Sequence, residues 1–511
     1  MSEAIAGLPP PPPGKPPRDA SAVIVWRRTW RGVEVFWLER EQRLSFAGGF
    51  FAFPGGKVDA ADDLVPVRGA SGDAAKLVAT AARELFEETG LLVARGPRLE
   101  PDGPRLEQEA LDGLRKQVLD GASFAEVLQA HGLELFASDF RPAGRWLTPP
   151  YLPVRFDARF FLVEAPEGQV ASVWPGELAS GEWIRPSDAL VRWEAGSALL
   201  HPPNLHALSV MNGFTSVDEA VAALSAPPWC EDFISRRLEF QRGVHVVPLE
   251  TPTLPPATHT NAYVLGTREL LLVDPGAPDE AEARKLVTLV KELEAAGCEA
   301  KAVVLTHHHG DHTGGAQLVA AALGLPVWAH AQTAARVQVP VVRLLEDGEV
   351  LALDGPLPMR WRVLHTPGHA PGHVCLFDER SHAGVVGDMV STVSTIIIDP
   401  PEGDMKVYLE QLERLRVLPL GALYPAHGPV VAHGVAKLEE YLEHRAWREA
   451  KVLEAVRSFA LPAGLEQVVP RAYDDVGSFI WPIAERNTVA ILQKLVAEHR
   501  VLVADGKYRA A

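Results

Sequence analysis

The chain has 511 residues, too many for one hydrophobic core, and this length suggests roughly two to four domains. Asp plus Glu total 66 and Lys plus Arg total 49, so the formal net charge is −17. That charge disfavours nucleic acid as a general partner and suits metal binding, because carboxylates are metal ligands. The three cysteines have no paired spacing, so we expect no disulfide framework and a cytoplasmic location. There is no signal pattern or bilayer-length apolar run, so no membrane partner is expected.

The first half of the chain mixes strands and helices behind a proline-rich leader. The leader, residues 1–19, is expected to be extended and poorly ordered. In chain order, the predicted elements are strands at 21–27 and 33–40, a helix at 77–92, and strands at 156–164 and 181–184. This pattern predicts a mixed α/β domain over residues 20–235.

The second half alternates strands and helices to about residue 445 and then becomes helical. The predicted elements are a hairpin at 260–274, helices at 279–296 and 315–324, strands at 301–306 and 326–329, helices at 444–459 and 483–499, and a closing hairpin at 501–508. We therefore expect a second α/β domain at 236–445 and a small tail domain at 446–511.

Three glutamates share one face of the helix predicted at 77–92. Glu84, Glu87 and Glu88 stand at i, i+3 and i+4, and Arg83 is the only adjacent cation. A hard divalent cation, Mg²⁺ or Mn²⁺ above all, would relieve the repulsion between their carboxylates. A solvated acidic helix is the alternative for these glutamates taken alone.

Joined to the upstream glycine turn at 53–59, the helix segment Ala81–Leu91 resembles the Nudix box. The resemblance implies a Nudix α/β/α sandwich that hydrolyses a nucleoside diphosphate linked to another group. It also implies that Glu84, Glu87 and Glu88 hold the metal ions and act in catalysis, with Arg83 orienting them.

The box departs from the usual Nudix spacing. An insertion occupies residues 60–76, and the glutamate expected soon after Gly56 is absent, so Asp59, Asp62 or Asp63 is expected to replace it. This inserted form is similar to the acyl-CoA diphosphatase subgroup, which implies a CoA-like or nucleotide-like small molecule as substrate.

A cluster of metal-ligand side chains follows a predicted buried strand. The segment Thr306–His312 reads THHHGDH and precedes a new helix, so its imidazoles and carboxylate can converge in a cleft and bind two metal ions. Because the run is internal and follows a strand, it is not expected to be a tag. Three further ligand-type residues, His369, Asp388 and His427, also follow predicted strands.

This order of residues, over about 243–445, resembles the metallo-β-lactamase superfamily. The resemblance implies an αββα sandwich with two Zn²⁺ ions, although iron occupies the related sites in some members. One ion would be held by His307, His309 and His369, the other by Asp311, His312 and His427, and Asp388 would bridge both. A shared hydroxide would be the nucleophile, and Asp311 would act in catalysis. Asp274 is expected to orient a ligand histidine. His308, His330, His365 and His373 are expected to be core or surface histidines rather than ligands, with substrate contact as the alternative for His373.

The segment from Pro425 to Glu449 resembles the endoribonuclease and glyoxalase II-like branch, whose endoribonuclease members end in a winged-helix domain, here 446–511. The Lys and Arg residues of this tail domain and of the chain just before it are offset by many Asp and Glu residues, which favours a structural role over RNA binding. We expect a multidomain α/β hydrolase that cleaves an ester, thioester or phosphodiester, with acyl-CoA or a related small molecule favoured, and a Nudix site that cleaves a pyrophosphate. The alternatives are an endoribonuclease, for which RNA is the partner, and a hydrolase regulated by a non-catalytic Nudix ligand sensor.

Overall fold

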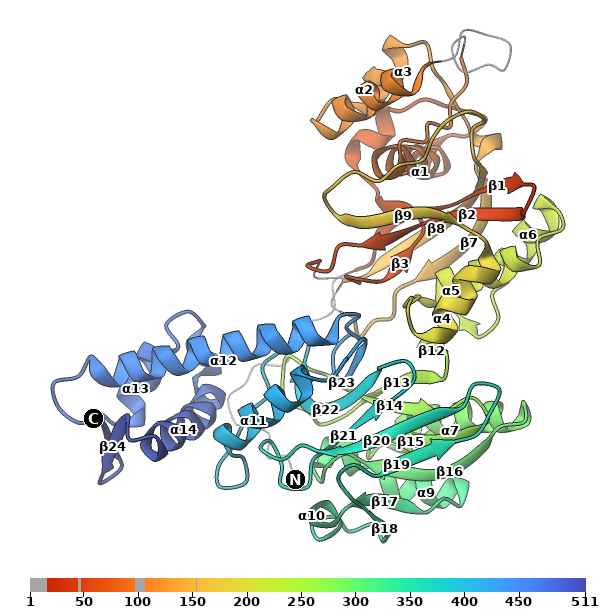
Figure 1. The fold of residues 1–511 in the computed structure, drawn as a ribbon. Helices are drawn as coiled ribbons and strands as arrows, with labels where there is room; N and C mark the ends of the chain where they lie inside the picture. The colour runs from red at the N-terminus through yellow and green to blue at the C-terminus, as the bar shows by residue number, and fades with distance from the viewer. Residues whose placement is uncertain (1–15, 45–46, 97–105, 153) are drawn as a thin grey trace. The chain divides into compact units, whose positions relative to one another are not determined.

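The computed structural model describes residues 16–44, 47–96, 106–152 and 154–511, which form two compact units, shown as a ribbon in Figure 1. Most of the expected leader lies outside the described residues, and strand β1 already begins at Arg18. The units divide between Arg242 and Gly243, a few residues beyond the expected boundary at 235. β12 (Leu238–Gln241) belongs to the first unit, in which the Leu200 N–H donates to the Phe240 carbonyl at 2.9 Å.

The first unit is built on a seven-stranded mixed sheet among the described residues. Its strands are β1 (Arg18–Thr29), β2 (Gly32–Arg40), β3 (Phe51–Ala52), β4 (Gly55–Lys57), β7 (Arg141–Leu147), β8 (Phe156–Glu164) and β9 (Leu178–Ile184). The order is β3-β2-β1-β8-β7, with β4 beside β1 and β9 beside β2. β1 and β8 run in parallel, and β4 lies antiparallel to β1.

Helices cover both faces of this sheet because the strands are apolar on both faces. Val23 and Val25 pack on one face with Leu85 of α1 (Gly72–Thr89), and Ile24 and Trp26 pack on the other with α4, α5 and α6. The remaining elements of the unit are η1 (Ala60–Leu64), β5 (Val67–Arg68), α2 (Gln108–Leu119), α3 (Phe124–Ala130), β6 (Leu135–Phe136), η2 (Ala137–Asp139), α4 (Pro186–Ala195), α5 (Pro202–Asn212), α6 (Val217–Leu224), β10 (Cys230–Glu231) and β11 (Ile234–Ser235). This is an α/β/α sandwich.

The second unit contains two sheets that face each other. The first runs β13 (Val244–Glu250), β14 (His259–Leu265), β15 (Glu269–Val273), β16 (Glu299–Leu305), β17 (Val327–His330) and β18 (Val341–Leu345). The second runs β19 (Val350–Leu353), β20 (Met359–His365), β21 (Val374–Asp378), β22 (Gly384–Ser391) and β23 (Leu423–His427). Tyr263 of β14 donates its hydroxyl to the Pro425 carbonyl of β23 at 2.6 Å, which ties the sheets together.

Helices cover the outer faces of both sheets (Figure 1). The helices of this part are α7 (Glu280–Ala295), α8 (Gly310–Thr313), α9 (Ala316–Leu323), α10 (Ala331–Ala334), α11 (Met405–Arg416) and α12 (Gly434–Arg457). Leu286 and Val290 of α7 pack on the first sheet, and Leu412 of α11 packs beneath the second. The layers are therefore αββα, as expected.

The helix predicted at 444–459 begins earlier in the structure. α12 runs unbroken from Gly434 to Arg457, so the expected boundary at 445 falls inside it. No Gly or Pro interrupts residues 435–457, and nothing in that stretch favours a break. The rest of the tail is α13 (Leu465–Ala472), η3 (Ser478–Ile480), α14 (Trp481–Ala497), β24 (Val501–Ala504) and β25 (Lys507–Ala510). Among the described residues, no helix has the length and apolar character that a bilayer crossing requires.

Candidate metal centre

The predicted ligands of the second unit lie at or near strand ends. His307 and His309 follow β16, whereas Asp311 and His312 lie on the short α8. The other three ligands complete the set: His369 follows β20, Asp388 lies in β22 and His427 ends β23. The two facing sheets thus supply side chains to one place.

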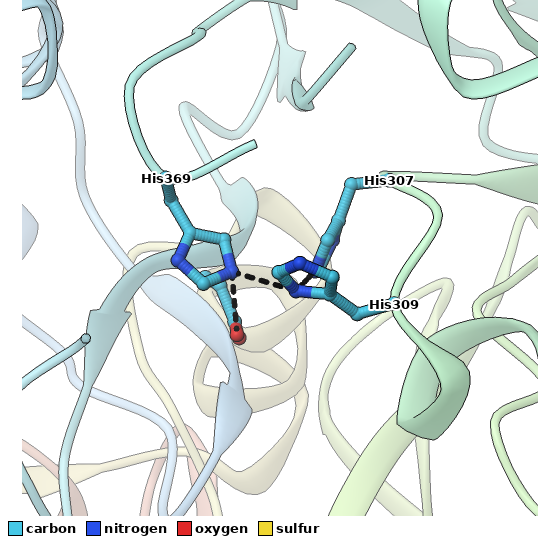
Figure 2. Close-up of side chains that lie close together, drawn as sticks. His307, His309 and His369 are labelled. Atoms are coloured by element: carbon cyan, nitrogen blue, oxygen red, sulfur yellow. Dashed lines mark hydrogen bonds and ion pairs between the residues drawn. The ribbon is translucent and has the colours of Figure 1, made fainter. Parts of the chain in front are cut away.

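The first predicted set converges as expected. The Nδ1 atom of His309 lies 3.0 Å from Nε2 of His307 and 3.0 Å from Nε2 of His369 (Figure 2). Together with Asp388, these residues offer four ligand atoms that all lie within 4.8 Å of one another. Burial lowers the pKa of His369 to about 4 and that of His307 well below its usual range, so both rings are neutral at physiological pH. Neutral imidazoles are the form that binds a metal ion.

The second predicted set also converges, and Asp388 contacts both sets. Asp311, His312 and His427 form a separate group of ligand atoms within 4.8 Å. The Oδ1 atom of Asp388 lies 3.3 Å from Nε2 of His427, and its Oδ2 atom lies 3.3 Å from Nε2 of His369. One carboxylate therefore reaches both groups, which is the arrangement of a bridging ligand.

The buried polar atoms of the second set fit a cation. Within the described part of the chain, His312 Nε2 and Asp388 Oδ1 are buried without a hydrogen-bond partner, and they lie 3.5 Å apart. Burial lowers the pKa of His312, but Asp388, Asp311 and Asp274 outweigh that effect and raise it well above its usual range. Burial also raises the pKa of Asp388, but His427 and His312 outweigh it and hold that pKa well below its usual range. Without a metal ion the set retains a proton, which a bound divalent cation would displace.

The second nitrogen of every predicted histidine ligand faces a group that can hold it. Fixing that nitrogen fixes the tautomer and the direction of the other one. The partners are Thr306 Oγ1 for His307 (3.0 Å), Glu402 Oε2 for His309 (3.6 Å), Asp274 Oδ2 for His312 (2.8 Å), the Ile397 carbonyl for His369 (2.8 Å) and the His259 carbonyl for His427 (3.1 Å). Asp274 thus lies where the sequence predicted it, beside a ligand histidine.

The structure places His373 in the core and adds Glu402, a residue that the sequence did not indicate. His373 is fully buried, with Nδ1 2.8 Å from Thr366 Oγ1 and Nε2 accepting the Asp388 N–H at 3.0 Å, so it supports the backbone of β22 rather than touching substrate. Glu402, which no motif indicated, lies 2.9 Å from His308 Nε2 and groups with His308 and His309.

In the first unit, the glycine turn contacts the carboxylate helix directly. A Cβ atom at Gly56 would lie 2.4 Å from Oε1 of Glu84, and the Gly55 N–H donates to Oε2 of Glu88 at 2.8 Å. Arg83 donates to Glu84 at 2.9 Å and to Glu87 at 3.0 Å. Burial raises the pKa of Glu84 to about 7 and that of Glu88 to about 8, and it also raises that of Glu87.

Each of the three aspartates named as substitutes for the missing glutamate makes a different contact. Asp62 is buried and accepts from Arg83 Nε at 2.7 Å and from Thr80 Oγ1 at 2.7 Å. Asp63 pairs with Lys76, and Asp59 caps η1. Among the described residues, the sets of three or more ligand atoms within 4.8 Å do not include the glutamates of α1.

Comparison with known proteins identifies the second unit. Residues 255–427 match the family described as the metallo-beta-lactamase superfamily, and residues 465–509 match the beta-lactamase associated winged helix domain. The second unit is therefore a metallo-beta-lactamase domain with a C-terminal winged helix, and by class the chain is a metal-dependent hydrolase. The multidomain α/β class predicted from the sequence is confirmed.

Individual relatives cover different parts of the chain. A beta-lactamase-like protein 2 homolog of Caenorhabditis elegans is 28% identical over 241 residues, which are 46% of this chain and 78% of that protein. The atrochrysone carboxyl ACP thioesterase of Aspergillus fumigatus is 31% identical over 202 residues, 39% of this chain and 44% of that protein. A solved NUDIX hydrolase from Alicyclobacillus acidocaldarius is 29% identical with a TM-score of 0.36, covering 42% of this chain and 99% of that one.

Proposed function

We propose that the second unit is a binuclear zinc hydrolase that cleaves a thioester, with acyl-CoA or a related small molecule as the substrate class. The observation that carries this proposal is the contact of Asp388 with both ligand groups, through Oδ2 to His369 and through Oδ1 to His427. His307, His309 and His369 would hold one ion, and Asp311, His312 and His427 the other. Two bound Zn²⁺ ions would activate a water molecule as nucleophile and polarise the carbonyl that it attacks.

The chain's own residues prepare this chemistry before any substrate binds. The carbonyl and carboxylate partners of the histidines fix which nitrogen faces inward, and Asp388 and Asp311 supply the negative charge that a pair of divalent ions needs. The proposed ligand atoms are nitrogen and oxygen only, which suits Zn²⁺. Metal analysis of the purified chain distinguishes zinc from iron at this centre.

The choice of a thioester rests on a relative and on the first unit. A relative that shares 202 aligned residues is named as a thioesterase acting on an acyl carrier protein, whose acyl groups are thioesters as they are in acyl-CoA. An ester or phosphodiester would be attacked by the same nucleophile, so the substrate panel must include both.

We further propose that the first unit is a Nudix hydrolase domain that cleaves a pyrophosphate linkage with Mg²⁺ or Mn²⁺. Glu84, Glu87 and Glu88 would bind the ions and Arg83 would orient two of the glutamates, to which it already donates. Their raised pKa values support this, because a divalent cation offsets the cost of ionising buried carboxylates. A CoA thioester contains both a pyrophosphate and a thioester, so one compound would serve both sites.

The test is incubation of the full chain with acyl-CoA compounds and zinc plus magnesium, followed by mass spectrometry. Asp311→Asn is expected to abolish thioester cleavage and spare pyrophosphate cleavage, and Glu88→Gln is expected to do the reverse. Each variant is thus the control for the other. Intact thioester and intact pyrophosphate with the wild-type chain would contradict the proposal.

RNA cleavage and ligand sensing are the two alternative functions, and each has its own measurement. Several cations of the tail are paired with acids: Arg448 with Asp475, Lys451 with Asp474 and Lys494 with Glu449. If the wild-type chain cleaves single-stranded RNA and Asp311→Asn does not, RNA cleavage replaces thioester cleavage as the proposed function. A sensor role would show as hydrolase activity that responds to nucleotides while the first unit turns nothing over. A cytoplasmic location stays a proposal alongside these.

A further inference from the structure

The segment 391–403, which joins β22 to α11, contacts two of the histidines of the first predicted metal set. We call this segment the strap. Its Ile397 carbonyl accepts from Nδ1 of His369 at 2.8 Å, and its Glu402 carboxylate lies 3.6 Å from Nε2 of His309. The direction of the His369 ring therefore depends on where the strap holds one peptide group.

Helices α12 and α14 hold that same peptide group, through its N–H, and the carbonyl of the peptide before it. The Ile398 N–H donates to Oδ1 of Asn487 on α14 at 2.9 Å, and Nη2 of Arg445 on α12 donates to the Ile396 carbonyl. Asn487 is 7% exposed and Arg445 is 4% exposed, so both bonds lie away from water, where their loss is costly.

Apolar packing and further polar contacts add to these two bonds. Ile396 and Ile398 are buried in one cluster with tail residues including Leu453, Ile491 and Leu492. At the start of the strap, the Tyr441 hydroxyl donates to the Ser394 carbonyl at 2.9 Å. Beyond Ile398, Arg486 pairs with Asp399 at 2.9 Å. The strap is therefore held along most of its length by α12 and α14.

We propose that Asn487 is a positioning residue of the metal centre, which acts through the Ile397 carbonyl on His369. The winged-helix tail would then complete the first metal site, besides any binding role that such a domain serves elsewhere. When the Nδ1–H of His369 is held, Nε2 is presented as the ligand atom, and losing such an outer contact usually weakens metal binding. This inference rests on the proposed function, because it needs an ion at His307, His309 and His369.

The experiment compares three substitutions in α14 of the full chain. Asn487→Leu keeps the approximate size but removes the oxygen that accepts from Ile398, and Asn487→Asp keeps an oxygen there. Thr488→Val is the matched control, because Thr488 is also buried but donates within its own helix, to the Ala484 carbonyl at 2.8 Å. Zinc affinity at each site is measured by competition with a chromophoric chelator, and the coordination is followed by the absorption of the cobalt-substituted protein.

Asn487→Leu is expected to weaken the first site by about 10- to 100-fold and to leave the second site within about threefold of wild type. The cobalt spectrum should change with it, Asn487→Asp should restore most of the affinity, and Thr488→Val should match wild type. This selectivity separates positioning from a general loss of stability, which would weaken both sites together.

Wild-type affinity at both sites in a folded Asn487→Leu chain would overturn the inference, and so would an equal loss at both sites. If that variant does not fold by circular dichroism, Arg486→Gln loosens the same strap from the surface. It should weaken the first site alone by a few fold, and no change there overturns the inference. A wild-type chain that binds no zinc would instead overturn the proposed function.

Discussion

Asp274 and His312 form a pair that is almost completely buried, with side chains 2% and 0% exposed and Nδ1 of His312 2.8 Å from Oδ2 of Asp274. Oδ1 of Asp274 accepts the Thr306 N–H at 2.7 Å. One carboxylate therefore connects the end of β15 to both ends of the histidine segment, and it sets which nitrogen of His312 faces the second metal set.

Replacing Asp274 by Asn should weaken zinc binding at the second set by about 10- to 100-fold, because the amide removes the charge that holds the Nδ1–H of His312. Titration with a competing chelator measures this change. Asp279→Asn, which alters only the N-cap of α7, is the control and should have wild-type affinity. Unchanged affinity in Asp274→Asn would mean that His312 needs no such partner.

Zinc should stabilise the second unit against heat. Saturation at about 1,000 times the dissociation constant corresponds to about 4 kcal/mol of unfolding free energy. The transition of the second unit, followed by calorimetry after chelation and again after zinc addition, should move upward. His307→Ala should reduce this shift strongly, while His330→Ala, outside both predicted sets, should retain it. An equal shift in both variants would contradict the assigned ligands.

The glutamates of α1 predict a pH dependence for the first unit in the absence of divalent cations. The pKa of Glu88 is raised to about 8 by burial, so the folded state holds a proton that the unfolded state releases above its ordinary pKa of 4.5. This contribution to stability is present in full below pH 4.5 and is lost as the pH rises through about 8. Thermal unfolding from pH 5 to 8 should show this decline, with less of it in Glu88→Gln or with magnesium. The same slope in Glu88→Gln would exclude Glu88 as its origin.

A methyl group at Gly56 should displace the Glu84 carboxylate, since the Cβ would lie 2.4 Å from its Oε1 atom. Gly56→Ala should therefore lower magnesium-dependent pyrophosphate cleavage at least tenfold while leaving thioester cleavage unaffected. Gly72→Ala is a poor control because Gly72 has a left-handed φ of 56°. Gly113→Ala in α2 suits the purpose, because a Cβ atom there would meet no atom within 4 Å apart from its chain neighbours and its own helix backbone. Full pyrophosphate cleavage in Gly56→Ala would show that the site does not require the close approach of the glycine turn to Glu84.

The sequence indicated which side chains of the second unit converge, because each of them follows a local signal. A strand end with a Gly or Pro turn precedes His369 and His427, and the compact segment 306–312 supplies the rest. The secondary-structure predictions also rest on local patterns. The strand predicted at 156–164 is β8, and the helix predicted at 279–296 is α7 within one residue at each end.

The missed contacts depend on the tertiary path of the chain. Glu402 lies far along the chain from His309, and Asn487 is 89 residues from Ile398, so no sequence pattern predicts either contact. The same holds for Asp62, one of three aspartates named as substitutes: its pairing with Arg83 follows from how the insertion folds over α1. His373 was expected to be a core or surface histidine, and its two ring nitrogens contact Thr366 and the Asp388 N–H.

The zinc content of the purified full chain, measured by plasma mass spectrometry, tests the central claim most directly. The two ligand sets predict about two zinc ions per wild-type chain. Asp388→Ala, which removes the carboxylate shared by both sets, should retain markedly less, and Glu88→Gln should equal wild type. Equal zinc in the wild-type and Asp388→Ala chains would contradict a binuclear centre bridged by Asp388.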